Sequence, residues 1–290
     1  PQQALLIKHS PWGGEHDHYD RLGLMLWHHD GWLLPDMGTT GYGAKMHYDY
    51  YKNSATHNTL SVNQTNQPPA NPQVSGWHMD SDALWLDSEV DWGKPPPELD
   101  SHSRVEWDAT AWRDVRFRRR LLWLEEVLID LSTVENPHRQ QLDWTLHLAA
   151  QALDQSGTPQ PFSLSGPLRH MANATMAPLN GCQPRHFARD GDTVALWLSG
   201  DGELWQGVAP DNPATHDLSY LVIRSHLPQA RFVCLWDFAN SAPLTEVQVN
   251  HTPVGTQITF WRGERVTHVT LYDAPGKRPD AIFPFAESGT

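Results

Sequence analysis

The sequence has few cysteines and no long apolar run. Cys182 and Cys234 are the only cysteines among 290 residues. Two cysteines cannot build a disulfide framework, and this pair lacks the spacing of a metal site. No apolar stretch approaches the ~20 residues of a membrane span, and the N-terminus shows no charged and apolar signal pattern. We therefore expect neither a disulfide scaffold nor a membrane-spanning helix.

Positive charge is also scarce. The 21 lysines and arginines are outnumbered by 34 aspartates and glutamates, which gives a formal net charge of −13 at pH 7. Nucleic-acid binding depends on a basic surface, so the composition argues against a nucleic-acid partner. An anionic ligand would need a local positive site on this chain.

Helical periodicity is scarce, whereas strand-like alternation of apolar and polar residues recurs along the chain. The pattern predicts an all-β protein, a large antiparallel β-sandwich, for which 290 residues are sufficient. We expect strands at residues 4–8, 22–28, 31–36, 58–63, 84–90, 103–108, 115–124, 126–134, 142–149, 193–199, 203–209, 219–225, 231–237, 244–250, 256–262 and 267–273.

Three segments rich in proline, glycine or polar residues interrupt these strands, at 64–75, 93–100 and 151–168. We interpret them as surface excursions. A weak boundary near 238–244 divides a β-sandwich domain at residues 1–240 from terminal strands at 241–290. We expect the terminal strands to pack on the same sandwich.

The chain is rich in tryptophan, with 14 residues. Trp12 adjoins a glycine turn just before a pair of histidines, so we expect it near a ligand. Five others lie in strand-like alternation and are expected to pack the sandwich core: Trp85, Trp107, Trp123, Trp144 and Trp197.

Three further polar features each allow two interpretations. The basic run from Arg116 to Arg120 is interpreted as the solvated side of a strand, with a substrate or partner surface as the alternative. His147 could line a cleft or be a hydrogen-bonded structural histidine. Arg224 could bind a ligand carboxylate or form an internal salt bridge.

The most informative motifs lie near the N-terminus. His16 and His18 are two residues apart, and such residues point to the same face of an extended chain. A turn at Asp30-Gly31 would return the chain as a second strand toward Asp36, and a third apolar strand opens after His57. Three neighbouring strands of a small β-meander could thus deliver His18, Asp36 and His57 to one point.

Two imidazoles and one carboxylate are a ligand set that zinc accepts, with a fourth position for water or a neighbouring group. The other histidine, His16, could remain free for acid-base work or hold a substrate anion. With 17 histidines in the chain, ordinary surface or core histidines are the alternative, and spacing alone does not decide between them.

The longer motifs that contain these residues resemble those of a known family. They read Gly-Gly-x-His-Asp-His-Tyr-Asp-Arg from Gly13, Pro-Asp-x-Gly-Thr-Thr-Gly-Tyr-Gly from Pro35, Tyr-Asp-Tyr-Tyr-Lys-Asn from Tyr48 and Thr-His-Asn-Thr from Thr56. In this order they resemble the C-terminal β domain of heparinase II/III-type polysaccharide lyases, and within that group most closely the exolytic oligoalginate lyases. The motif-rich match covers residues 12–69, and it implies a two-sheet supersandwich.

The resemblance implies that His16 is catalytic and that His18, Asp36 and His57 bind a structural zinc. The family reaction is β-elimination at a uronic acid. In that reaction the C5 carboxylate is neutralised, a base takes the C5 proton and an acid protonates the departing glycosidic oxygen. The residues expected to contact the substrate are Trp12, Arg21, Tyr42, Tyr48 and Tyr50.

The resemblance also implies a partner, because in these lyases an N-terminal α/α-toroid domain carries part of the machinery. No such domain is present in this chain, which reaches its first motif soon after Pro1. We therefore expect a C-terminal piece that holds half of an active site. The expected substrate is an acidic, alginate-type polysaccharide or oligosaccharide. A heparin-type glycosaminoglycan lyase and a non-catalytic carbohydrate-binding β-sandwich are the alternatives, and a bacterial cytoplasm or periplasm is the expected compartment.

Overall fold

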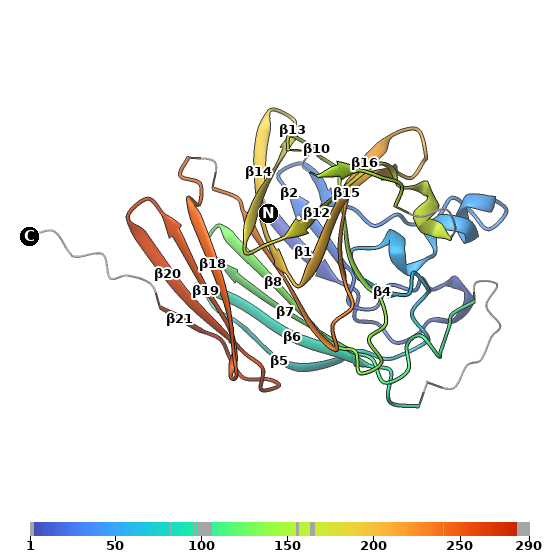
Figure 1. The fold of residues 1–290 in the computed structure, drawn as a ribbon, viewed down its shortest axis with the longest axis horizontal. Coiled ribbons are helices and arrows are strands. Elements are labelled where there is room, and N and C mark those ends of the chain that lie inside the picture. Colours follow the sequence, from blue (N-terminus) through green and yellow to red (C-terminus); the bar gives the residue numbers. More distant parts are fainter. Residues whose placement is uncertain are drawn as a thin grey trace, which may run out of the picture.

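The chain is almost entirely antiparallel β-structure. The computed structural model describes residues 3–81, 83–95, 97, 106–154, 157–162, 166–239 and 241–282. These residues form four sheets (Figure 1). Helical structure in these ranges is limited to the short turns η1 (Gly14–His16), η2 (His47–Tyr51), η3 (Ser54–Thr56) and η4 (Pro167–His170). The predicted all-β sandwich class is confirmed.

Two large sheets make up the sandwich. In spatial order, the eight-stranded sheet contains β10 (Gln151–Ala152), β13 (Gln183–Arg189), β14 (Asp192–Gly200), β17 (Gln229–Asp237), β8 (Val127–Glu135), β7 (Arg116–Leu124), β6 (Ala83–Asp91) and β5 (Gln73–Met79). In spatial order, the six-stranded sheet contains β11 (Thr158–Pro159), β12 (Ala172–Leu179), β15 (Gly202–Pro210), β16 (Asp217–Ser225), β9 (Leu142–Leu148) and β4 (Leu60–Val62).

The main core lies between these two sheets, and β8 shows how alternation builds it. Leu128 and Val134 belong to the core cluster on one side of the sheet, whereas Ile129 and Leu131 belong to a second cluster on the other side. Successive strand residues point to opposite faces, so one strand serves two cores. Of the five tryptophans expected in the core, Trp85, Trp144 and Trp197 are buried, whereas Trp107 and Trp123 are partly buried.

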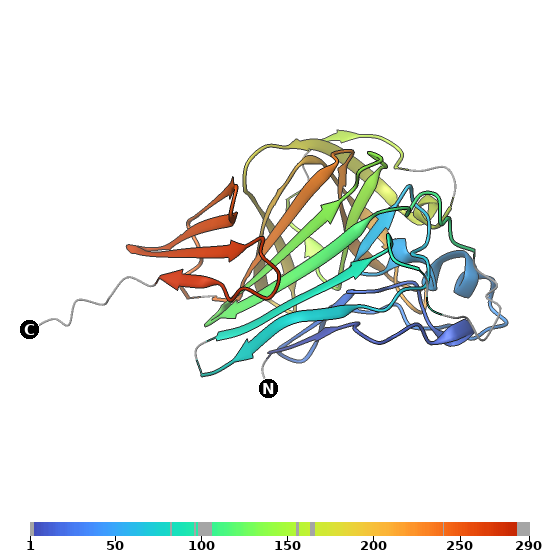
Figure 2. The same ribbon diagram turned by 90° about the horizontal axis from the view of Figure 1, so that it is seen from below.

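Two smaller sheets flank the sandwich. One is β1 (Gln3–Ile7), β2 (Leu24–His28) and β3 (Gly31–Leu34), and it contributes Leu26 and Leu33 to the main core. The other is β18 (Glu246–Thr252), β19 (Gly255–Arg262), β20 (Arg265–Tyr272) and β21 (Asp280–Ile282). It covers the outer face of the eight-stranded sheet through the second apolar cluster (Figure 2).

The strand predictions fail where polar residues or prolines obscure the alternation. The strands that were not predicted are β5, β10, β11, β12, β13 and β21. β5 begins inside the segment 64–75, and β10 and β11 lie inside the segment 151–168, both of which were interpreted as surface excursions. Pairing with a neighbouring strand holds such sequences extended, because β-propensity depends on context. The strand predicted at 103–108 falls partly outside the described residues, and residues 106–108 form no strand.

The prediction that the basic run on β7 is solvated was wrong for Arg118, Arg119 and Arg120, whereas the Arg116 side chain is 43% exposed. Arg118 forms a two-point ion pair with Asp87, Arg119 forms one with Asp130, and Arg120 is 2% exposed. The reason is that β7 lies inside the sheet, where both of its faces are covered. Buried charges of this kind require partners.

Arg119 also joins the sheet to the N-terminal loops. Its side chain is 0% exposed, its Nε lies 2.9 Å from Asp130 Oδ1, and its Nη2 lies 2.5 Å from Asp130 Oδ2. The remaining nitrogen, Nη1, donates to the carbonyls of Leu22 at 2.7 Å and Asn58 at 2.6 Å. One guanidinium thus links two of the segments near the predicted site residues to the eight-stranded sheet.

Replacing Arg119 with methionine is expected to destabilise the fold by about 3–5 kcal/mol, because Asp130 would be left as an unpaired buried charge. Chemical denaturation measures this loss. The matched control is Arg265→Met, since Arg265 is 60% exposed and lies 3.8 Å from Glu125. The control should stay within about 0.5 kcal/mol of the parent protein. Equal effects of the two substitutions would contradict the anchoring role.

Candidate metal centre and catalytic pair

Loops, rather than three strands of one meander, bring the predicted metal ligands together. His18 follows η1, Asp36 follows β3, and His57 lies between η3 and β4. The hairpin between β2 and β3 forms as predicted. However, β4 belongs to the six-stranded sheet, and His16 ends a helical turn rather than sharing an extended strand with His18.

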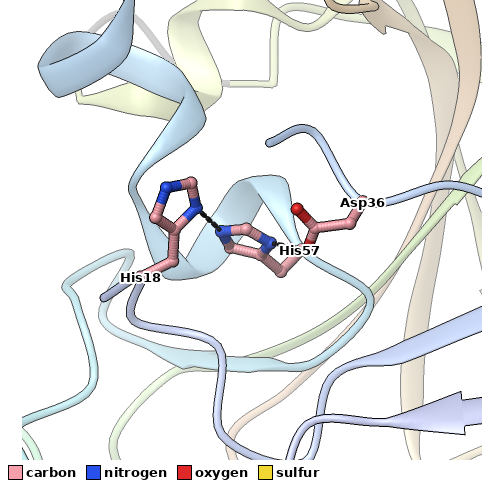
Figure 3. A group of neighbouring side chains, drawn as sticks. All are labelled: His18, Asp36 and His57. Carbon is pink, nitrogen blue, oxygen red and sulfur yellow. Dashed lines mark hydrogen bonds and ion pairs between the residues drawn. The ribbon is translucent and has the colours of Figure 1, made fainter. Parts of the chain in front are cut away.

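His18, Asp36 and His57 nevertheless form one cluster, in which one ligand atom from each residue lies within 4.8 Å of the others. Nδ1 of His18 lies 3.3 Å from Nε2 of His57 (Figure 3). On the opposite edge of the His57 ring, Nδ1 lies 2.9 Å from Oδ2 of Asp36. The described residues contain no other group of this kind.

Hydrogen bonds from outside the cluster fix the loops. Thr145 Oγ1 donates to the His57 carbonyl at 2.6 Å, and the side chain of Asn58 donates to the carbonyls of Leu24 at 2.8 Å and Pro35 at 3.0 Å. The Gly38 amide donates to Asp36 Oδ1 at 2.7 Å. These contacts hold the ligand positions against each other, as partners around a metal shell commonly do.

The pKa values of the two histidines shift in opposite directions, because only His57 is in contact with the Asp36 carboxylate. Burial and the neighbouring His57 lower the pKa of His18 to about 3. Burial lowers the pKa of His57 as well, but the Asp36 carboxylate outweighs it and the pKa is raised overall. Two imidazole nitrogens that face each other need either a proton or a cation between them. Of the two rings, His57 is therefore the more readily protonated.

The residues fit zinc. Zinc–nitrogen bonds of about 2.0–2.1 Å in a tetrahedral site place two ligand nitrogens about 3.3 Å apart, and the His18 and His57 nitrogens are 3.3 Å apart. Asp36 offers an oxygen donor, but its Oδ2 contacts the opposite edge of the His57 ring, so its side chain would have to turn toward Nε2 to bind the same metal. A fourth position would then stay available for water. Zinc binding remains a prediction based on this donor set.

His16 lies outside the cluster and pairs with a tyrosine. Nδ1 of His16 is 2.6 Å from the hydroxyl of Tyr42, and the two rings meet edge to face with centroids 5.0 Å apart. His16 is exposed, and Tyr42 is 44% exposed. An imidazole in a short hydrogen bond with an accessible phenol is a pair that can move a proton to or from a ligand.

A cleft of about 400 Å³ opens beside these groups. Two apolar side chains of the small three-stranded sheet, Leu6 and Met25, form part of its wall. Its polar lining includes Lys8, His16, His18, Asp36, Thr39 and His57. The His18–Asp36–His57 cluster and His16 therefore face the same solvent-accessible space.

The other residues expected to contact substrate lie elsewhere. Trp12 is half-buried and stacks on Tyr19 with ring centroids 5.1 Å apart. Arg21 is 1% exposed, and Tyr50 is 1% exposed within an apolar cluster. Arg21 and Tyr50 thus point into the protein, because ion pairing and packing sequester them, and neither position can contact a substrate. Tyr48 is half-buried beside Lys52.

The structure also shows the surroundings of Arg224 and His147, each of which had two interpretations. Arg224 pairs with Asp143 at 2.7 and 3.0 Å, which is the internal salt bridge. His147 is fully buried and stacks on Tyr220, but its ring nitrogens have no hydrogen-bond partner among the described residues. The expectation of a hydrogen-bonded histidine was therefore wrong. Burial lowers the pKa of His147 to about 3, so the ring is neutral.

The motif analysis missed His47. This buried side chain contacts the rings of His18, Tyr42 and Tyr48, with centroids 5.7, 5.0 and 4.7 Å away. It thus lies between the His18–Asp36–His57 cluster and the His16–Tyr42 pair. No spacing rule would have identified it, because η2 is an irregular helical turn whose direction is set by packing.

Comparison with known proteins shows the family to which the chain belongs. The family description "Heparinase II/III-like, C-terminal" matches residues 2–233. The chain belongs to this family. The match includes the three-stranded sheet, all loops of the site and most of the sandwich, whereas the four-stranded terminal sheet lies beyond it. A search of curated proteins found no significant match.

Solved structures show the same fold for this heparinase II/III-like domain. The heparinase III BT4657 gene product matches with a TM-score of 0.59 at 10% identity, over 97% of this chain and 39% of that one. Heparan sulfate lyase HepC from Pedobacter heparinus matches with a TM-score of 0.56 at 12% identity, over the same shares. The chain thus spans about two fifths of each relative's length.

No helix in the described part of the chain has the length and apolar character that membrane crossing requires.

Replacing His18 with alanine is expected to abolish stoichiometric zinc in the purified protein and to lower its melting temperature, because one ligand and the link between two loops are lost. Elemental analysis and thermal unfolding measure the two effects. His226→Ala is the control, since His226 is an exposed histidine on a different loop. Unchanged zinc content in the His18 variant would contradict the ligand assignment.

Proposed function

We propose that this chain is the C-terminal domain of a polysaccharide lyase that cleaves a uronic-acid-containing substrate by β-elimination. The observation that carries the proposal is the 2.6 Å hydrogen bond between His16 and Tyr42, beside a cleft shared with a zinc-type cluster. Family membership supports the same activity class. The alginate-type substrate follows from the motif resemblance.

Elimination needs a proton removed from C5 and a proton delivered to the departing oxygen. The exposed Tyr42 hydroxyl can carry such a proton, and His16 can accept from it or donate to it through Nδ1. In this proposal Tyr42 acts at the reacting centre, whereas its sequence position predicted only a sugar contact.

Zinc has a structural role in this proposal, since it would hold the His18, Asp36 and His57 loops together. The cluster lies next to the turn that carries His16, so its loss would displace the catalytic pair. Lewis-acid chemistry is not required, because the protons are handled by Tyr42 and His16. The N-terminal α/α-toroid domain of the full-length protein would supply the remaining substrate contacts.

A heparin-type glycosaminoglycan is the second candidate substrate. The solved relatives are named heparinase III and heparan sulfate lyase, and they share the fold with this chain. Assays of the full-length protein with alginate oligosaccharides and with heparan sulfate distinguish the two, because both reactions create an unsaturated uronate that absorbs ultraviolet light. Turnover of alginate alone supports the first candidate.

The variants Tyr42→Phe and His16→Ala of the full-length protein are expected to lower kcat by about 10²–10⁴-fold, the range associated with a lost proton-transfer group. Because both side chains are accessible, the unfolding midpoint should hardly change. Tyr272→Phe is the control, since Tyr272 lies in the terminal sheet. Sugar binding with no turnover in the parent protein would instead favour a carbohydrate-binding module.

A further inference from the structure

A buried lysine lies behind the proposed catalytic pair and has no part in the proton transfers. The Lys52 side chain is 0% exposed. It follows directly after η2, and its backbone amide donates to the His47 carbonyl at 3.0 Å. Burying an ammonium group is costly, so its contacts indicate what it does.

The ammonium group of Lys52 is directed at η1, the turn that ends in His16. It donates to the backbone carbonyl of Glu15, and it lies 3.2 Å from the Glu15 carboxylate. The rings of Tyr19 and Tyr48 enclose it, each with its centroid 5.9 Å from Nζ. Aromatic faces favour a cation at this distance, and exclusion of water strengthens the contact with Glu15.

The residue on the other side of His16 is held in the same way. Asp17 accepts from the guanidinium of Arg21, pairs with Lys8 at 2.8 Å and accepts from the Gly13 amide at 2.9 Å. His16 is therefore an exposed residue between Glu15 and Asp17, each of which is held by a buried cation.

The partner of His16 depends on the same helical turn. Nδ1 of His47 lies 3.1 Å from Thr39 Oγ1, and that hydroxyl accepts from the Gly41 amide at 3.0 Å. This connection braces the loop that carries Tyr42. One end of η2 thus supports Tyr42 through His47, and the other end supports His16 through Lys52.

We propose that Lys52 is a positioning residue that sets the distance between His16 and Tyr42 by holding the Glu15 carbonyl, with Arg21 as the second arm of the clamp at Asp17. The inference rests on the proposed lyase function for its kinetic consequence, but its geometric consequence stands without it. The ammonium group of Lys52 holds η1 in place and does not contact the substrate.

The test uses Lys52→Met in the full-length protein. A crystal structure should show the distance from His16 Nδ1 to Tyr42 Oη increased beyond about 3.5 Å, the limit of a hydrogen bond. With a uronate substrate, kcat should fall roughly 10–100-fold, as small misplacements do, while KM changes less than about threefold. If Lys52 were purely structural, its replacement would lower the melting temperature without lowering kcat more than it changes KM.

Two further variants complete the design. Lys52→Gln keeps a donor on a shorter side chain and replaces the methionine variant if that one fails to fold. Lys94→Met is the control, because Lys94 is 54% exposed and only approaches Asp91 at 3.7 Å. It should leave both the distance and kcat unchanged.

A His16–Tyr42 distance that stays at the parent value in the Lys52 variants would overturn the proposal, whatever the substrate. If the parent protein cleaves no uronate but the distance increases, the positioning role stands and the lyase assignment fails. A Lys94 variant that loses kcat as strongly as the Lys52 variants would overturn the specific role of Lys52.

Discussion

The buried pair of Arg119 and Asp130 is the interaction on which the rest of the site depends. Asp130 belongs to β8 at the middle of the eight-stranded sheet, and Arg119 belongs to its neighbour β7. The guanidinium uses one edge to bind the carboxylate and its remaining nitrogen to hold the Leu22 and Asn58 carbonyls. Irregular loops that carry reactive groups need a rigid support, and Arg119 links them to the eight-stranded sheet while Thr145 and the backbone of His147 link them to the six-stranded sheet.

Several positively charged side chains of this acidic chain are buried, and they bind carbonyls and carboxylates inside the molecule. Arg21, Lys52 and Arg119 are each 0–1% exposed, and each holds backbone carbonyls as well as a carboxylate. A cation that binds several acceptors fixes several loop segments at once, which apolar packing cannot do with irregular backbone. Under the proposed lyase function, recognition of an acidic sugar would fall to the exposed His16–Tyr42 pair, to Lys8 at the cleft and to the proposed N-terminal domain.

The alternation of apolar residues was sufficient to predict the sandwich class, since β7, β8, β16 and β17 show it clearly. It could not predict β5 or β12, whose polar and proline-containing sequences are held extended by their neighbours. It also misassigned the arginine run, because local sequence does not show that both faces of β7 are covered. Burial is a property of the packed sheets, and the same residues on an edge strand would be solvated.

The identities and order of His16, His18, Asp36 and His57 were determined by the sequence alone, because the side chains specify which metal and proton chemistry is available. Their spatial arrangement was decided by the tertiary structure. The pairing of His16 with Tyr42, the burial of Arg21 and Tyr50, and the role of Lys52 depend on loops that cross between sheets. Such loops have no periodicity, so contacts distant in sequence set their path.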